Sequence, residues 1–367
     1  MSLHDSLPPG CEPACHGCRH RSLDARESLA QKHDYLCRVL AEWADRIAPV
    51  RGPPAAERLG YRERVTLTAR WDLAAGWRFG LVRRDELIAI HDCPVHEPRV
   101  NALVRHLVRR LPGAVPFPLA YLHVAGAQAT LIAKARAVEV ARLAPVLDGL
   151  PDGIEGLWLH LHPSAGRRLF ARRGWQLLCG SGESRDSSGL LHGPTAFMQA
   201  SPRLHEAAIA AAVVHLDPGP QTAVLDLYCG HGSTLSAWRA SGSATLGVEL
   251  SGEAVRFAAR NAPGAELLRG TCAQRLPQIR DWWQARGACR VAYVNPPRSG
   301  LEPEVVAALA RELQPARLAY LSCSAGTLAR DLRVLADGGY VVRDLRPYDF
   351  FPLTQHVEML ALLQREA

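Results

Sequence analysis

The chain has 367 residues, of which 48% are hydrophobic and 22% are charged, and its formal net charge is +7. This length suits two domains, or two with a small appendage, and it excludes a coiled-coil or fibrous protein. No apolar run approaches the roughly 20 residues needed to cross a bilayer, and the first ten residues lack the basic and apolar regions of a signal peptide. We therefore expect a cytoplasmic protein that contacts no membrane.

The positive charge is carried almost entirely by arginine, because Lys32 and Lys134 are the only lysines. Arginine suits bidentate phosphate contacts and stacking on bases, and net positive charge favours a polyanion through counterion release. A genomic preference for arginine codons explains the same composition. Charge alone therefore does not select a nucleic-acid partner.

Residues 1–60 read as a cysteine-rich segment followed by a helix. Three cysteines stand in a polar stretch with Pro, Gly and His: Cys11, Cys15 and Cys18. Cytosolic thiols stay reduced, so such a group predicts a metal-binding knuckle, and a fourth thiolate is needed for either zinc or a 4Fe–4S cluster. Cys37 and Cys93 are the candidates for it. An amphipathic helix is expected from Ser22 to about Ile47.

Residues 61–190 predict an α+β domain with an antiparallel sheet. Short β-like runs, such as Arg64–Arg70 and Glu86–Ile90, alternate with an apolar helix near Val100–Leu111. A Gly- and Ser-rich break at Gly180–Gly189 ends this region. We expect RNA recognition to come from the part of the chain before residue 190.

Residues 191–367 predict an α/β domain of the doubly wound, Rossmann-like type. Helix-like stretches alternate there with apolar strands at Thr222–Leu227, Thr245–Leu250, Arg290–Val294, Arg317–Leu321 and Tyr340–Arg346. This alternation is typical of a parallel sheet covered by helices.

The first of these strands runs into a tight turn containing Gly230 and Gly232. Ligands of such sheets lie at the carboxyl ends of the strands, and glycine lets the backbone approach them closely. Leu235 takes the place of the third glycine of a dinucleotide fingerprint, which disfavours a pyrophosphate. Glu249 follows Asp226 by about 20 residues, where an acidic side chain binds ribose hydroxyls. Asp226, Gly230 and Gly232 are expected to bind the cofactor as well. An adenosine without pyrophosphate fits, and S-adenosylmethionine is the commonest such cofactor; a turn without a ligand is the alternative.

Three side chains are expected at that same edge of the sheet. Asn295 and Cys323 follow successive strands, and Glu358 returns to the edge if the last two strands form a hairpin. Methylation of carbon 5 of uracil needs a thiolate that adds to carbon 6 and a base that removes the carbon 5 proton. Cys323 would be the nucleophile, Glu358 the base, and Asn295 a ligand of uracil or of the cofactor. The target base would be flipped out or lie in a loop.

Each of these residues has a simpler explanation when taken singly. A cysteine ending a strand is often a small buried hydrophobe, Asn-Pro-Pro is often only a turn, and Glu358 could be a solvated edge residue. Two other functions also remain open. An N-methyltransferase acting on adenine or an amine would leave Cys323 without a role, and a non-catalytic RNA-binding protein would carry a relict cofactor fold.

Three segments carry a family resemblance: Tyr293-Val-Asn-Pro-Pro-Arg-Ser-Gly-Leu, Tyr320-Leu-Ser-Cys-Ser-Ala-Gly-Thr-Leu-Ala-Arg-Asp-Leu and Tyr348-Asp-Phe-Phe-Pro-Leu-Thr-Gln-His-Val-Glu. They resemble the 5-methyluridine RNA methyltransferases, the bacterial tRNA and 23S rRNA uracil-C5 enzymes, over most of residues 190–367. The resemblance implies that Cys323 is the nucleophile and Glu358 the base. It also implies S-adenosylmethionine ligands: Gln199, Tyr228, Glu249 and Asn295.

Two positions depart from the family pattern. Asn295 stands where the family often has Asp, although the Asn-Pro-Pro-Arg sequence is similar to that of the 23S rRNA enzyme RlmC. Ser201 stands where an Asn usually follows the Gln. By the same resemblance, Cys93 is the fourth ligand and the metal group is a 4Fe–4S cluster. The implied partner is RNA, 23S rRNA in preference to tRNA, and no obligate protein partner is evident.

Overall fold

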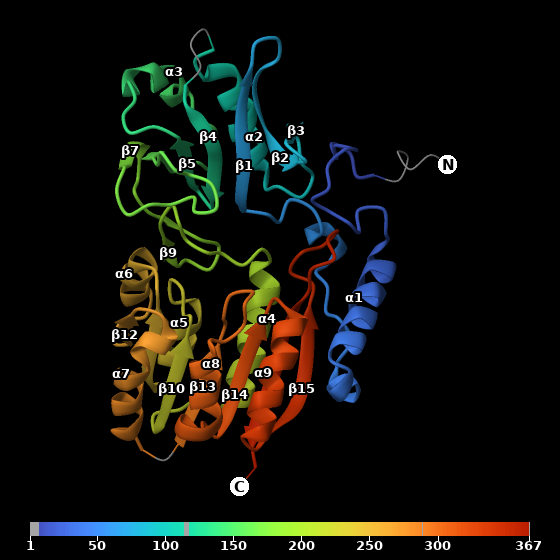
Figure 1. Cartoon of the computed structure of the whole chain (residues 1–367), viewed down its shortest axis with the longest axis vertical. Helices are drawn as coiled ribbons and strands as arrows, with labels where there is room; N and C mark the ends of the chain where they lie inside the picture. The colour runs from blue at the N-terminus through green and yellow to red at the C-terminus, as the bar shows by residue number, and fades with distance from the viewer. Residues whose placement is uncertain (1–6, 114–116, 288, 367) are drawn as a thin grey trace. The chain divides into compact units, whose positions relative to one another are not determined.

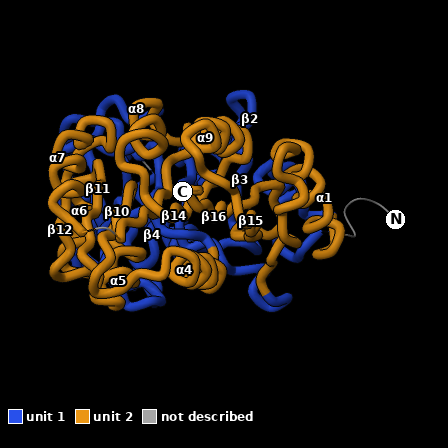
Figure 2. Tube along the Cα trace, turned by 90° about the horizontal axis from the view of Figure 1, so that it is seen from below, with its two compact units in different colours: residues 1–22, 54–200 blue, residues 23–53, 201–367 orange. Residues whose placement is uncertain are grey.

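The computed structural model describes residues 7–113, 117–287 and 289–366. The chain forms two compact units (Figure 2): unit 1 is Met1–Ser22 with Pro54–Ala200, and unit 2 is Leu23–Pro53 with Ser201–Ala367. The residues 23–53, grouped above with the cysteines, therefore pack with the C-terminal half. The expected absence of a signal peptide rests partly on residues 1–6, outside the described residues. Among those described, no helix has the length and apolar character needed to span a membrane.

Unit 1 is built on a seven-stranded sheet in the order β3-β2-β1-β4-β5-β6-β7. Its strands are β1 (Arg64–Asp72), β2 (Gly76–Arg83), β3 (Glu86–Ala89), β4 (Leu119–Ala125), β5 (Gln128–Ala133), β6 (Gly156–Leu161) and β7 (Trp175–Gly180). Neighbouring strands are antiparallel, as the sequence predicts, except that β5 and β6 are parallel. The segment between them, with η4 (Val140–Leu143) and α3 (Ala144–Leu147), provides the crossover that a parallel pair requires.

Helix α2 (Pro98–Arg110) packs against this sheet. It begins with Glu97 as N-cap and Pro98 in the first turn, where the missing N–H of proline has no cost. Its buried apolar residues recur at helical spacing and join the core of unit 1: Val100, Leu103, Val104 and Leu107. A two-stranded sheet of β8 (Ser184–Arg185) and β9 (Leu191–His192) lies in the same unit.

Unit 2 holds a second seven-stranded sheet in the order β12-β11-β10-β13-β14-β16-β15. Its strands are β10 (Thr222–Leu227), β11 (Ala244–Glu249), β12 (Glu266–Arg269), β13 (Cys289–Val294), β14 (Arg317–Ser322), β15 (Tyr340–Tyr348) and β16 (Glu358–Arg365). The first five in this order are parallel, and β16 is antiparallel to both neighbours. The predicted Rossmann-like α/β fold and the terminal hairpin are confirmed. The sequence does not signal the short edge strand β12, because its residues are not buried.

Helices cover both faces of this sheet (Figures 1 and 2). One face carries α4 (Pro202–Leu216), α5 (Ser233–Ala240) and α6 (Gly252–Asn261). The other carries α7 (Cys272–Gln284), α8 (Pro303–Ala308), η5 (Leu309–Leu313) and α9 (Ala325–Asp337). Every residue of β10 is buried as a result, which explains why this strand is continuously apolar apart from two polar positions.

Helix α1 (Ala25–Val39) also belongs to unit 2. A capping box between Asp24 and Glu27 begins it. The helix ends at Val39, earlier than predicted, because its C-cap Leu40 has non-helical backbone angles (φ −107°, ψ 39°) and the chain tightens into the 3-10 turn η2 (Ala41–Arg46). Leu36 and Leu40 are fully buried in the core beside α9 and the sheet. The N-terminal helix is thus part of the α/β unit.

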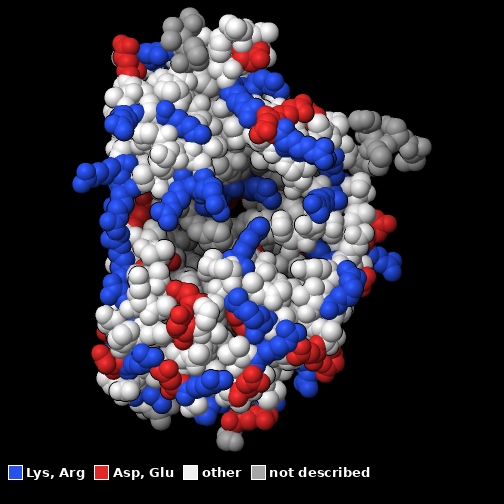
Figure 3. Space-filling view, in the orientation of Figure 1, with Lys and Arg blue, Asp and Glu red and all other residues white. Residues whose placement is uncertain are grey.

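Lys and Arg side chains are spread over the face of the molecule in Figure 3, with Asp and Glu among them. Many of the arginines of unit 2 are paired with carboxylates, as in Arg280 with Glu312 and Arg333 with Glu42. Exposed pairs of this kind contribute little to stability.

Candidate active site

The turn after β10 has the geometry of a ligand-binding loop. Gly230 has φ +57° and nothing lies within 4 Å of the position where its Cβ would be, so the backbone borders open space. Gly232 has φ +96°, and a Cβ there would come within 3.1 Å of the Ala258 Cα atom. Gly230 thus leaves room for a ligand, whereas Gly232 permits close packing of α5 on α6.

Glu249, at the end of β11, lies beside this turn and contacts its backbone. Its carboxylate accepts hydrogen bonds from the backbone nitrogens of Gly230, at 3.1 Å, and Ser251, at 2.6 Å. The carboxylate therefore lies beside the open space above Gly230. This is the position that the sequence predicts for a ligand of ribose hydroxyls.

Asp226 is directed into the protein interior. Its carboxylate is fully buried and accepts hydrogen bonds from the Thr234 hydroxyl (2.6 Å) and the Trp238 indole nitrogen (2.7 Å) on α5. Burial raises the pKa of Asp226 to about 7, and the two hydrogen bonds oppose this shift. This geometry favours anchoring of α5 below the turn. A direct contact between Asp226 and a cofactor stays a prediction.

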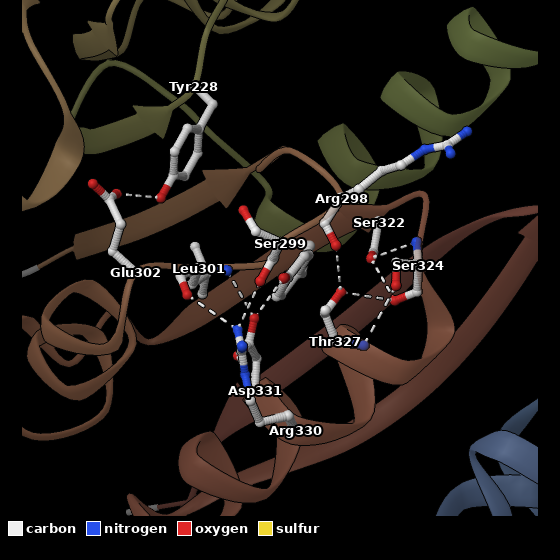
Figure 4. A network of polar contacts seen from close by, with 11 residues as sticks. Tyr228, Arg298, Ser299, Leu301, Glu302, Ser322, Ser324, Thr327, Arg330 and Asp331 are labelled. Atoms are coloured by element: carbon white, nitrogen blue, oxygen red, sulfur yellow. Dashed lines mark hydrogen bonds and ion pairs between the residues drawn. The ribbon is translucent and has the colours of Figure 1, made fainter. Parts of the chain in front are cut away.

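Tyr228 has a left-handed backbone, with φ +62°, which is uncommon for a residue other than glycine. Its hydroxyl donates a 2.7 Å hydrogen bond to the Glu302 carboxylate, at the N-cap of α8 (Figure 4). Burial and the neighbouring Cys272 and Glu302 all raise the pKa of Tyr228. The ring is consequently a neutral hydrogen-bond donor held at one orientation beside the glycine turn.

Cys323 and Glu358 lie at the same edge of the sheet. Cys323 directly follows β14, and Glu358 is the first residue of β16, which pairs with β14 through Ser322 and Met359. Burial raises the pKa of the half-buried Cys323 thiol, and the charge of Glu358 raises it further. Burial likewise raises the pKa of Glu358 to about 7. The predicted nucleophile and base are therefore brought close together.

Arg298 is a third member of this group that the sequence analysis left without a role. Its guanidinium lowers the pKa of both Cys323 and Glu358, and it acts on the thiol through a hydrogen bond as well as through charge. Asn295 stands at the start of the same loop, where its backbone nitrogen donates to Leu227 at 3.2 Å. The Asn-Pro-Pro-Arg pattern was the available signal for Arg298.

A network of hydrogen bonds from α9 holds the loop that carries Arg298 (Figure 4). The Thr327 hydroxyl donates to the backbone oxygen of Arg298 at 3.4 Å. The Arg330 guanidinium donates to the backbone oxygens of Ser299 and Leu301, each at 3.1 Å. These α9 residues come from the same motif as Cys323, so one motif supplies the thiol and supports the loop that faces it.

The remaining candidates lie in unit 1. Gln199 is the second-last residue of that unit, so it does not share a unit with the other predicted cofactor ligands. The four cysteines predicted as metal ligands do share unit 1: Cys11, Cys15, Cys18 and Cys93. The pKa of Cys18 is raised to about 11, mainly by burial and also by the other three thiols, while Arg62 lowers it. Cys37 is on α1 in unit 2, 3.6 Å from His33. Within the described residues, no three His, Cys, Asp or Glu side chains already form a metal-binding group.

Comparison with known proteins extends these observations. A model of the tRNA (uracil-5-)-methyltransferase family matches residues 273–366. The 23S rRNA (uracil(1939)-C(5))-methyltransferase RlmD of Pseudomonas entomophila is 31% identical over an alignment of 374 positions, which covers 95% of this chain and 78% of that protein. RlmD of Pseudomonas putida is 32% identical over an alignment of 378 positions, with coverage of 95% and 78%. These relatives carry the name RlmD, whereas Asn295 suggested a likeness to RlmC.

The crystal structure of Pyrococcus abyssi tRNA (uracil-54, C5)-methyltransferase in complex with S-adenosyl-L-homocysteine superposes with a TM-score of 0.73. It covers 96% of this chain and 86% of that one at 20% identity, so the likeness shows a common fold. The fold and the glycine turn define an S-adenosylmethionine-dependent methyltransferase. Identity above 30% over most of the RlmD chain places it more narrowly: this chain belongs to the family of RNA uracil-C5 methyltransferases.

Proposed function

We propose that this protein methylates carbon 5 of a uridine in 23S rRNA, with Cys323 as covalent nucleophile and Glu358 as base. The observation that supports this most directly is the grouping of a thiol, a buried carboxyl and a guanidinium at one sheet edge. Neither amine methylation nor RNA binding alone calls for a cysteine beside a carboxyl of raised pKa.

The reaction begins at the Cys323 thiolate. It adds to carbon 6 of uracil, forming a carbon–sulfur bond, and the electron pair of the double bond moves into the enolate of carbon 5 and O4. When bound, S-adenosylmethionine supplies the methyl group that carbon 5 takes up. Glu358 then accepts the carbon 5 proton, and the electrons of that bond restore the double bond as the carbon–sulfur bond breaks. The thiolate of Cys323 is regenerated.

The electrostatics of the site suit both residues. With a pKa of about 7, Glu358 is close to the value at which a general base combines availability with strength near neutral pH. Arg298 favours the thiolate of Cys323 and the carboxylate of Glu358 alike, which offsets part of the effect of burial. Arg298 would thus keep both groups in the forms that the reaction requires.

The cofactor would lie over the open backbone at Gly230. Glu249 is placed for the ribose hydroxyls, and the Tyr228 ring borders the same turn. By family resemblance, Asn295 and Gln199 complete the set of ligands. Asp226 would then support the turn through its hydrogen bond with Thr234 on α5, and Gly232 by permitting the close packing of α5 on α6.

The four cysteines of unit 1 would hold a 4Fe–4S cluster. Four thiolates are the donor set of such a cluster, and the mutual effects on the pKa of Cys18 indicate that these thiols lie near one another. Methyl transfer needs no electrons, so the cluster would stabilise residues 7–22 against the rest of unit 1 or contact RNA. Zinc in the same ligands is the alternative.

The named relatives favour 23S rRNA as substrate, and we expect the protein to act in the cytoplasm without an obligate protein partner. The family description and the Pyrococcus structure name tRNA, which makes a tRNA uridine the second candidate. The test is incubation with S-adenosylmethionine and either unmodified 23S rRNA or tRNA, followed by mass spectrometry of 5-methyluridine.

A parallel reaction uses RNA containing 5-fluorouridine, from which the carbon 5 substituent cannot be removed. A trapped adduct on Cys323 supports the covalent mechanism and identifies the RNA. Methylation without an adduct, together with an active Cys323→Ala variant, would favour an N-methyltransferase. Tight RNA binding with no methyl incorporation would favour a non-catalytic RNA-binding protein.

A further inference from the structure

A buried ion pair joins helix α1 to the segment that leads into Glu358. The Lys32 ammonium is paired with the Asp349 carboxylate, and it donates a second hydrogen bond, of 3.3 Å, to the backbone oxygen of Phe351. The two charged side chains are 0% and 4% exposed. A buried pair of this kind gives little net stability over apolar residues, but loss of one partner leaves an uncompensated charge. The structural effect of this pair is to hold residues 349–351 against helix α1.

Residues 47–51, which follow helix α1 and the turn η2, hold the backbone at Asp349. The nitrogens of Ala48 and Arg51 donate to the oxygens of Leu345 (2.8 Å) and Pro347 (2.9 Å) on β15, and the nitrogen of Asp349 donates to Arg51 (2.9 Å). Residues 47–51 therefore run along the free edge of β15 up to Asp349. Asp349 is the residue at which this pairing ends, and Lys32 holds its side chain.

A chain of hydrogen bonds continues from Lys32 toward the base. The backbone oxygen of Phe351, which Lys32 binds, also accepts from the Thr354 hydroxyl at 2.8 Å and from the Thr354 nitrogen at 3.1 Å. The same hydroxyl oxygen accepts from the backbone nitrogen of His356 at 3.1 Å. His356 is two residues before Glu358, so the contacts that begin at Lys32 extend almost to the start of β16.

We propose that Lys32 is a positioning residue for the general base: through Asp349 and Phe351 it sets the conformation of residues 349–357 and so the position of Glu358. Lys32 itself touches neither substrate nor cofactor in this scheme. The inference rests on the proposed function, because it assigns Glu358 the removal of the carbon 5 proton. It predicts that a substitution of Lys32 on α1 slows removal of the carbon 5 proton and leaves thiolate addition and methyl transfer unchanged.

The test is the Lys32→Met variant of the full chain, assayed with ordinary uridine RNA. Because Glu358 acts after the methyl group has been transferred, misplacing it delays release of the product from Cys323. The kcat should fall about 10- to 100-fold, as expected when a reacting group is displaced slightly. The methylated RNA covalently bound to Cys323, scarce in the wild type, should accumulate at steady state. The KM for S-adenosylmethionine should stay within about twofold, since ground-state binding of the cofactor is unaffected.

Two further variants separate positioning from general destabilisation. Glu42→Gln removes an exposed ion pair between residues 23–53 and Arg333 of α9, and it should show wild-type turnover without accumulated adduct. Lys32→Arg keeps the buried charge but alters its reach, so it serves if Lys32→Met does not fold; accumulation of the adduct is again expected. The inference would be overturned if kcat were unchanged, or if kcat fell without accumulation of the adduct. It would also be overturned if the KM for S-adenosylmethionine rose by the same factor as kcat fell. If the wild type forms no adduct with 5-fluorouridine RNA, the proposed function itself has failed.

Discussion

The buried carboxylate of Asp331 accepts a 2.9 Å hydrogen bond from the backbone nitrogen of Leu301, which ties helix α9 to the loop after β13. The same carboxylate accepts a 2.7 Å bond from the Tyr320 hydroxyl on β14 and pairs with Arg330 (Figure 4). Asp331 thus fastens the loop carrying Arg298 to the elements on both sides of Cys323. We therefore expect the spacing of the Cys323 thiol and the Arg298 guanidinium to depend on Asp331.

Replacing Asp331 by Asn tests that dependence. One of the two carboxylate oxygens becomes an amide nitrogen that cannot accept, so either the donors at Oδ2, Leu301 N–H and Tyr320 O–H, or the Arg330 donor at Oδ1 lose their acceptor. Loss of such a hydrogen bond costs about 1–3 kcal/mol. Chemical denaturation should show that loss of stability, and kcat should fall because Arg298 is less well held. The exposed variant Glu312→Gln, at a surface ion pair with Arg280, should change neither quantity. Wild-type stability in Asp331→Asn would contradict the role assigned to the network.

A Gly300→Ala substitution should disturb the same loop sterically. Gly300 has φ +77°, and a Cβ there would lie 2.6 Å from Arg330 Nη2 and 2.7 Å from Asp331 Oδ2. Gly189→Ala is the matched control, since it has φ +79° with nothing within 4 Å. The control should lose about 1–2 kcal/mol from backbone strain alone. Gly300→Ala should lose more stability and also turnover; equal losses of stability in both would show that the loop yields without cost.

The variant Arg298→Met should raise the pKa of the Cys323 thiol. Arg298 lowers that pKa by charge and by a hydrogen bond, so its removal leaves only a backbone hydrogen bond to oppose burial and the charge of Glu358. The measurement is the pH dependence of Cys323 alkylation by iodoacetamide, followed by mass spectrometry of the Cys323 peptide. Its midpoint should move to higher pH in the variant, and not in Arg280→Met. An unmoved or lowered midpoint would exclude a direct effect of Arg298 on the thiol.

Glu358→Gln should abolish turnover but stabilise the protein at high pH. The pKa of Glu358 is raised from 4.5 to about 7 in the folded state, so folding favours its neutral form. Stability from this group is fully present below pH 4.5 and is lost as pH rises through about 7. At pH 8 the variant should therefore gain roughly 2–3 kcal/mol on the wild type relative to pH 4. Asp226 titrates alike in both proteins and cancels. If the difference in unfolding free energy between the variant and the wild type did not change with pH, the pKa of Glu358 would not be raised in the folded state.

The cysteine proposal predicts the metal content of the purified protein. Anaerobically prepared wild type should contain iron and acid-labile sulfide, which Cys18→Ala and Cys93→Ser should lose. Cys37→Ser should keep them, because Cys37 lies in unit 2 rather than with the other four cysteines. Elemental analysis provides the check. Zinc without iron would replace the cluster by a zinc site, and loss of iron in Cys37→Ser would contradict the assignment of Cys93.

Several features of the site could be predicted from sequence because they are local. A strand that ends in glycines or in a cysteine places those residues at the carboxyl edge of a parallel sheet wherever the rest of the chain lies. Gly230, Glu249, Asn295 and Cys323 were predicted at this edge in this way, and they lie at or just after the ends of β10, β11, β13 and β14. Glu358 required one further assumption, that the final strands form a hairpin, and the register of β15 and β16 confirms it.

The tertiary structure decided what depends on side-chain direction and on distant contacts. The hydrogen bond that Asp226 accepts from Thr234 on α5, and the close approach of Gly232 to Ala258 on α6, are tertiary contacts that the sequence does not show. Lys32 and Asp349 are 317 positions apart, and neither residue signals the other in the sequence. Sequence periodicity reports which face of an element is buried. Which charged groups meet inside the fold is settled only when the elements pack, because only then does desolvation force each buried charge to find its partner.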